Sequence, residues 1–199
     1  MSPAVPAYVP LDLTQKFLYS FNEMMGPPRL IGLTVKAAMD QAQKSPNAWG
    51  SGVDSFGVRV ASRFGRAFLR EDIAFGVRAF DHEDPRYFRA GIGTGQSRTK
   101  SALYQTFMAR KDNVPGGSTW IPAYSRFLSD FAMPFLAQTW RPEPLNVARG
   151  FRQGSLALGM TFGSNLWQEF WPDIRKRFKI LRHAPSFENG VLIPAPSVP

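Results

Sequence analysis

Residues 51–68 read SGVDSFGVRVASRFGRAF, and this stretch decides the expected fold. Ser51 and Asp54 have the spacing of a capping box, so we expect a long helix to begin here. Valine and phenylalanine recur at helical spacing through the stretch and beyond it, as far as Phe80. Residues 73–80 alternate in a way that also suits a strand, and the pattern leaves that choice open.

A helical wheel separates two kinds of side chain in this segment. Four arginines fall within about 60° of one another: Arg59, Arg63, Arg66 and Arg70. Small residues lie on the opposite side at four-residue spacing: Gly57, Ala61 and Gly65. We call these the arginine stripe and the first glycine seam. Such a seam lets a second helix approach closely.

Helical periodicity also covers most of the remaining chain, in residues 11–25, 30–44, 101–110, 124–140 and 145–171, with a short basic continuation over 174–181. Pro134 predicts a kink or boundary, and Pro172 a new first turn. A second glycine seam comprises Gly150, Gly154, Gly159 and Gly163. We therefore expect an all-α domain of five to seven amphipathic helices packed through Gly and Ala seams. It should span residues 11–182, between a flexible leader (1–10) and a Pro-rich tail (183–199).

Composition narrows the function without naming it. The 199 residues are 44% hydrophobic, which suits a folded chain, and carry a net charge of +9. That surplus favours an anionic partner such as a lipid surface, a nucleic acid or an acidic protein. Cysteine is absent, which excludes disulfides and thiolate chemistry. Residues 1–10 lack the pattern of an export signal, and the longest uncharged stretch, 153–168, is shorter than a membrane span requires.

The arginine stripe is the first candidate site. No acidic residue shares it, and guanidinium groups favour bidentate contact with phosphate. Arg59, Arg63, Arg66 and Arg70 are therefore predicted to bind an anion. The alternative is a solvated helix face.

The densest polar cluster is DHEDPRY, residues 81–87. His82, Glu83 and Asp84 are candidate acid and base groups if a substrate pocket lies beside them. The alternative is a turn that ends the helix, with Arg86 bound to a carboxylate. Zinc-site spacing is absent, and we expect neither a metal nor a cofactor.

Two further segments suit anions. Glycines at 91, 93 and 95 precede a helix and could cradle a phosphate, or serve as a connector. Near the C-terminus, aromatic and cationic side chains adjoin in a pattern typical of a membrane interface: Trp171, Arg175, Lys176 and Arg177. The same cations would equally suit the dipole at a helix C-terminus.

Several local motifs together resemble an uncharacterised family of bacterial helical proteins. They are Gln41-Ala42 before Trp49-Gly50, Phe56-Gly57 to Phe64, residues 82–89, Arg110-Lys111-Asp112 and Glu169 to Ile174. The resemblance covers about residues 11–179. Members usually begin with an export signal, so it implies the cell envelope or periplasm if a leader has been removed. It implies no activity.

We therefore expect a non-enzymatic, envelope- or membrane-surface-associated protein that contacts anionic lipid or a protein partner through its basic and aromatic faces. Either glycine seam could also form a homo-oligomer. An enzyme using residues 82–87 and a nucleic-acid-binding protein are the alternatives.

Overall fold

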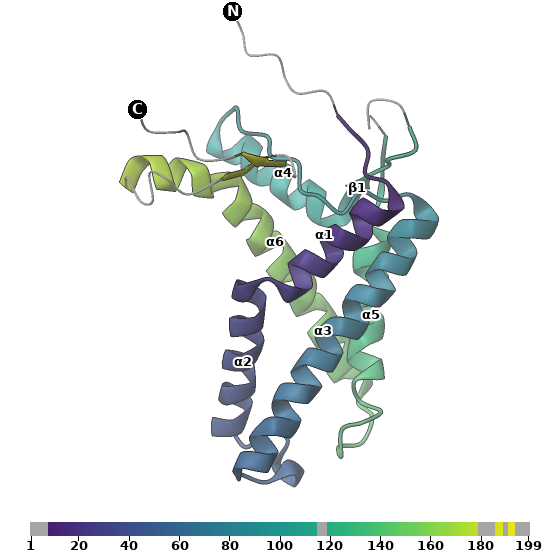
Figure 1. Ribbon diagram of the computed structural model, residues 1–199, viewed down its shortest axis with the longest axis vertical. Helices are drawn as coiled ribbons and strands as arrows, with labels where there is room; N and C mark the ends of the chain where they lie inside the picture. The colour runs from purple at the N-terminus through teal and green to yellow at the C-terminus, as the bar shows by residue number, and fades with distance from the viewer. Residues whose placement is uncertain (1–7, 115–118, 179–185, 189–190, 194–199) are drawn as a thin grey trace, which may run out of the picture.

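The computed structural model describes residues 8–114, 119–178, 186–188 and 191–193. Helix α3, Val53–Asp81, runs diagonally through the molecule (Figure 1). Residues 73–80 are therefore helical. The predicted capping box is wrong: Gly52 is the N-cap and no side chain caps it, so α3 begins two residues after Ser51. His82 ends the helix in the left-handed conformation, with φ of 58°.

Two shorter helices precede α3. Helix α1, Leu13–Met25, begins with a capping box in which the Asp12 side chain accepts a hydrogen bond from the backbone N–H of Gln15. Helix α2, Pro27–Ala42, starts one turn earlier than predicted, because Pro27 suits the first position of a helix. Gly26 ends α1 and begins α2, and a single turn of 3₁₀ helix, Asn47–Trp49, leads into α3.

Helix α4, Gly95–Phe107, is followed by the short strands β1, Met108–Arg110, and β2, Trp120–Pro122. The predicted helix 101–110 therefore ends three residues too late, since Met108 pairs with Pro122 and Arg110 with Trp120 in antiparallel register. Strands β3, Ser186–Glu188, and β4, Val191–Ile193, form a second antiparallel pair in the predicted tail.

Helices α5, Tyr124–Leu136, and α6, Val147–Phe178, complete the fold. Helix α6 continues through Pro172 rather than restarting there. Glu169 and Asp173 lie one turn apart on either side of Pro172, and both bind Arg98 of α4, which holds this part of α6 against its neighbour. Helix α3 packs on α1, α2 and α5, while α6 packs on α4 and α5. The predicted all-α fold class is confirmed, with six α-helices in the described residues.

Among the described glycines of the two seams, only the first two of the second seam, Gly150 and Gly154, pack closely against another helix. A Cβ atom at Gly150 would lie 2.6 Å from Phe135 of α5, and one at Gly154 would lie 2.5 Å from Phe131, so α5 approaches α6 closely at these two positions. At Gly57, Gly65, Gly159 and Gly163 a Cβ atom would meet nothing within 4 Å.

The distribution of side chains is inverted relative to a water-soluble domain. The largest side chains that are less than 2% exposed are all polar or charged: Arg59, Glu83, Glu169, Thr106, Asp84, Asp130, Ser125 and Ser129. Most buried apolar residues are alanines, whereas large apolar side chains on all six helices are more than a third exposed. Soluble proteins bury large apolar side chains and leave charges in water.

Candidate anion-binding cavity

The arginine stripe of α3 turns toward the inside of the molecule. Arg59 is fully buried, and its five N–H groups make five bonds of 2.7–3.1 Å to the Gln41 side chain and to the carbonyls of Ser45, Pro46, Gly50 and Ser55. A guanidinium with every donor used has none left for a ligand. Arg59 therefore ties the α2–α3 connection to α3.

Two more stripe arginines bind carboxylates of other helices. Arg63 makes two bonds of 2.7 Å to Asp40 of α2, and Arg70 donates to Asp130 of α5 at 2.6 Å. The acidic partners that the stripe itself lacks thus come from its neighbours. The predicted anion site narrows to Arg66, whose hydrogen-bond partner is the neutral Gln153, at 2.6 Å.

Arg66 lines a partly open cavity of about 530 Å³ between α1, α2, α3, α5 and α6. This volume falls within the range of small-molecule sites, about 300–1,000 Å³. The wall is polar and apolar in about equal parts, and Met24, Leu33 and Met160 contribute to its apolar part. The cavity is therefore large enough for more than a simple ion, and it is amphipathic.

Positive charge dominates the cavity wall. Seven cationic and three acidic side chains line it, a surplus of four charges: Arg29, Lys36, Arg63, Arg66, Arg70, Arg78 and Arg126 against Glu23, Glu71 and Asp130. Asp40, which binds Arg63 from outside the wall, reduces the surplus to three.

Three of the cations, Arg29, Lys36 and Arg66, form no ion pair within the described part of the chain. The pKa of Arg66 is lowered to about 10, first by burial and then by repulsion from Arg63 and Arg141. Burial also lowers the pKa of Lys36, and Arg29 is the next cause. An anion in the cavity would relieve this repulsion.

Arg126 also lines the cavity, but it serves the fold. Its guanidinium donates to the carbonyls of Gln105, Thr106 and Met108, where α4 ends. A cation at a helix C-terminus is favourable because the unpaired carbonyls carry partial negative charge. Burial, and then Arg78, lowers its pKa to about 10.

The sequence reasoning missed Arg29 and Lys36. A signal was available: Arg29, Leu33, Lys36 and Asp40 share one face of α2 within about 60°, opposite a row of apolar side chains. The apolar side chains of that row face outward: Ile31, Val35 and Met39 are more than half exposed.

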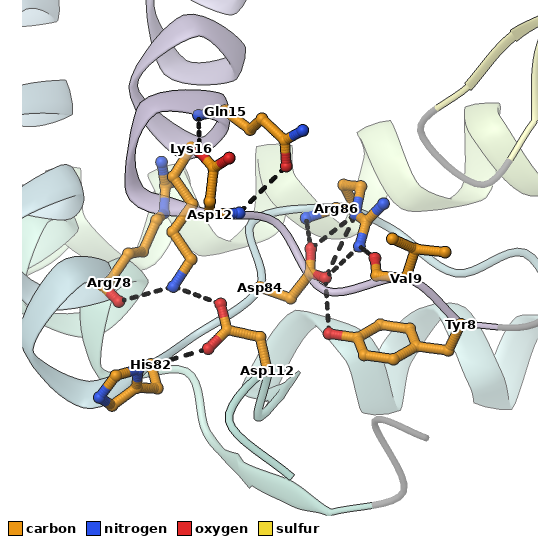
Figure 2. A network of polar contacts seen from close by, with 10 residues as sticks. All are labelled: Tyr8, Val9, Asp12, Gln15, Lys16, Arg78, His82, Asp84, Arg86 and Asp112. Carbon is orange, nitrogen blue, oxygen red and sulfur yellow. Dashed lines mark hydrogen bonds and ion pairs between the residues drawn. The ribbon is translucent and has the colours of Figure 1, made fainter. Parts of the chain in front are cut away.

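The residues proposed for acid–base chemistry have structural roles (Figure 2). His82 is half-exposed, and its Nδ1 lies 3.5 Å from Asp112 Oδ1. Asp84 is buried between Arg86, whose Nη2 lies at 2.6 Å, and the Tyr8 hydroxyl at 2.9 Å, which attaches the N-terminal arm. In the same network, Lys16 of α1 pairs with Asp112.

The third acid–base candidate, Glu83, accepts from the amide and the hydroxyl of Ser125 and so holds the first turn of α5. His82, Glu83 and Asp84 do not line the cationic cavity. The alternative of a turn with Arg86 bound to a carboxylate therefore describes this segment.

The glycine-rich loop does hold an anion, but an internal one. Glu169 is fully buried and accepts from the amides of Ala90 and Gly91, the Tyr87 hydroxyl and Arg98 Nε, all at 2.8–2.9 Å. Hydrogen bonding outweighs the effect of burial and lowers the pKa of this carboxyl. Of the predicted phosphate cradle, the Gly91 amide is therefore engaged by Glu169, while the N-terminus of α4 is capped by Thr94.

The predicted interface residues lie in the last two turns of α6. Trp171 stacks on Trp167 with ring centroids 4.6 Å apart. Lys176 and Arg177 are exposed, and Arg175 lies beside them in the same turns. The first glycine seam lies elsewhere, beside a groove lined by Trp49, Ala61, Gly65 and Trp140.

No protein-family model, curated protein or solved structure matches this chain. The resemblance to a bacterial envelope family and the cellular location it implies stay predictions. No helix among the described residues is long and apolar enough to cross a membrane.

Proposed function

We propose that this protein binds at a membrane interface, with the apolar faces of its helices in contact with lipid and its charged groups gathered inside. The observation that carries the proposal is the inverted side-chain distribution. Leu18 of α1, Val35 of α2 and Leu128 of α5 are each about half exposed, while Arg59 and Glu169 are fully buried. Exposed apolar surface of this extent marks an interaction site.

Lipid explains the distribution better than one protein partner does. A standard protein interface covers about 800 Å² on each side, a single patch. The exposed apolar side chains here occur on all six helices. Amphipathic helices that lie in the headgroup region bury one apolar face each without spanning the bilayer.

Charge and aromatic placement support the same location. The net charge is +9, which favours anionic lipid. Trp167 and Trp171, followed by Lys176 and Arg177, provide rings for the headgroup level and cations for its phosphates. A nucleic-acid duplex would need an outward basic face, whereas the arginine stripe turns inward.

Sedimentation with phosphatidylcholine vesicles tests this proposal. Leu18→Glu combined with Val35→Glu should reduce binding at least tenfold, because each removed side chain loses about 1.5–3 kcal/mol of burial in lipid. Both positions are exposed, so packing inside the molecule is undisturbed. Asn22→Glu on the exposed surface of α1 adds one of these two charges without removing an apolar side chain, and it should leave binding within about twofold.

A stable monomer in detergent-free buffer that sediments with no vesicle at low salt would exclude a membrane function. Binding that all three glutamates leave unchanged would refute the assigned faces. A soluble homo-oligomer that covers these faces would contradict the lipid contact in favour of the alternative of self-association.

A further inference from the structure

The cationic cavity contains more positive charge than the fold uses. Arg63, Arg70 and Arg78 are neutralised by Asp40, Asp130 and Glu71. Arg126 serves the end of α4. Arg29, Lys36 and Arg66 remain, and no carboxylate of the described residues pairs with them.

These three side chains retain unused donors. Arg66 donates one N–H of its guanidinium to Gln153, which leaves most of its N–H groups able to donate to a ligand. Arg29 and Lys36 lie on one face of α2, and both are exposed where they line the cavity. A ligand entering the cavity can therefore reach cations from two helices, α2 and α3.

Phosphate is the anion that this arrangement suits. Its oxygens accept several bonds at once, and a guanidinium matches two of them in one plane. Burial first, and then repulsion among the cations, lowers the pKa of Arg66 and Lys36, and a bound anion would offset the repulsion. Without a counter-ion, this cluster of like charges repels itself and opposes folding.

The remaining wall indicates what the phosphate is attached to. About 530 Å³ exceeds the needs of an inorganic ion. Met24 and Met160 lie on the wall, and methionine adapts to flexible apolar groups. Met160 is also 62% exposed, so apolar surface continues from the cavity to the outside of α6.

We propose that this cavity binds the phosphate group of an anionic phospholipid, with Arg66, Lys36 and Arg29 in contact with the phosphate oxygens and the methionines against its carbon chain. The inference rests on the proposed membrane function and names its ligand. Inorganic phosphate and glycerol phosphate share the chemistry of the headgroup, so they serve as soluble probes.

The test uses the full chain and vesicles of phosphatidylcholine with and without phosphatidylglycerol. Arg66→Gln and Lys36→Gln should each reduce the preference for phosphatidylglycerol at least about tenfold, the value of a lost charge-assisted hydrogen bond. Arg152→Gln, at an exposed position of α6 outside the cavity, removes the same charge and should keep the preference within about twofold.

Both cavity variants relieve repulsion, so their melting temperatures without ligand should equal or exceed the wild-type value. If Arg66→Gln fails to fold, Lys36→Gln decides alone. If all three variants keep the wild-type preference for phosphatidylglycerol, the proposed phosphate site is overturned, and the proposal of membrane binding is unaffected.

Soluble probes separate the two proposals. Binding of glycerol phosphate with the same sensitivity to both cavity variants supports a phosphate site. If glycerol phosphate binds in this way but the protein binds no vesicle, the phosphate site is supported with a soluble ligand. The phospholipid as its ligand and the proposed membrane function are then both refuted.

Discussion

Replacing Glu169 with glutamine should destabilise the junction of α4, α6 and the glycine-rich loop. The fully buried carboxylate accepts four hydrogen bonds, from Tyr87, Ala90, Gly91 and Arg98. An amide keeps one acceptor oxygen and turns an NH₂ group toward donors. At least one buried N–H or O–H group then loses its acceptor, and Arg98 loses a buried counter-charge.

The expected loss of stability follows from these contacts. A buried donor without a partner costs about 1–3 kcal/mol, and breaking a buried ion pair costs about 3–5 kcal/mol. Glu169→Gln should therefore lower the free energy of unfolding by about 3–5 kcal/mol, a large part of the total for a domain of this size. Asp173→Asn is the matched control: its side chain is 45% exposed, and it should cost less than about 1 kcal/mol.

Urea unfolding in a neutral detergent, followed by tryptophan fluorescence, measures both variants. Trp167 and Trp171 lie within one turn of Glu169 and report on this junction. A Glu169→Gln midpoint equal to that of Asp173→Asn would refute the reasoning, because the buried carboxylate would then contribute no more than an exposed one.

The same carboxylate predicts a pH dependence. Burial alone would raise the pKa of Glu169, but the bonds from Arg98, Gly91 and Tyr87 outweigh it, so the pKa lies below its usual value. The stabilisation is therefore complete above the unfolded-state pKa of about 4.3 and is lost as the pH falls through the lower folded-state pKa. The Glu169→Gln variant should lack this part of the acid-induced loss.

Two further predictions concern packing inside the fold. Arg59→Met should lower the free energy of unfolding by about 2–6 kcal/mol, because five acceptors lose their donor and the two in buried bonds, the carbonyls of Pro46 and Ser55, cost about 1–3 kcal/mol each. Arg59→Lys, with three donors, should not restore the loss; wild-type urea midpoints in both variants would show that the bonds contribute little. Gly154→Ala should lower the melting temperature because its Cβ would lie 2.5 Å from Phe131, whereas Gly159→Ala, with nothing within 4 Å, should raise stability by about 0.5–1 kcal/mol. Shifts of the same sign in the two glycine variants would contradict the difference in packing.

Helical periodicity predicted the class of fold and the location of every α-helix. Boundaries were less accurate wherever a tertiary contact decided them. The helix predicted over residues 101–110 gives way at Met108 to a strand paired with Pro122, and Pro172 does not interrupt α6, because Glu169 and Asp173 both bind Arg98. Pro122 and Arg98 are both far in sequence from the residues they contact, so local sequence patterns do not predict these contacts.

The candidate site was predicted only in part. Arg66 was named together with three other arginines of α3, but their different roles depend on partners from α2, α5 and the connecting loop. Arg29 and Lys36 were missed, because helical periodicity does not indicate that the charged face of α2 lies inside. Asp40 and Asp130 were likewise assigned no role, although they distinguish the neutralised arginines from Arg66.

The sequence by itself determined that the chain forms amphipathic helices with one charged and one apolar face, since spacing along a helix sets which side chains share a face. Only the tertiary structure decided which face lies inside. A helical wheel shows which side chains share a face but not whether that face meets solvent. A charged face can be buried when other helices supply partners for its charges. Here Asp40, Asp130 and Glu169 provide those partners, and the apolar faces of the helices are left exposed.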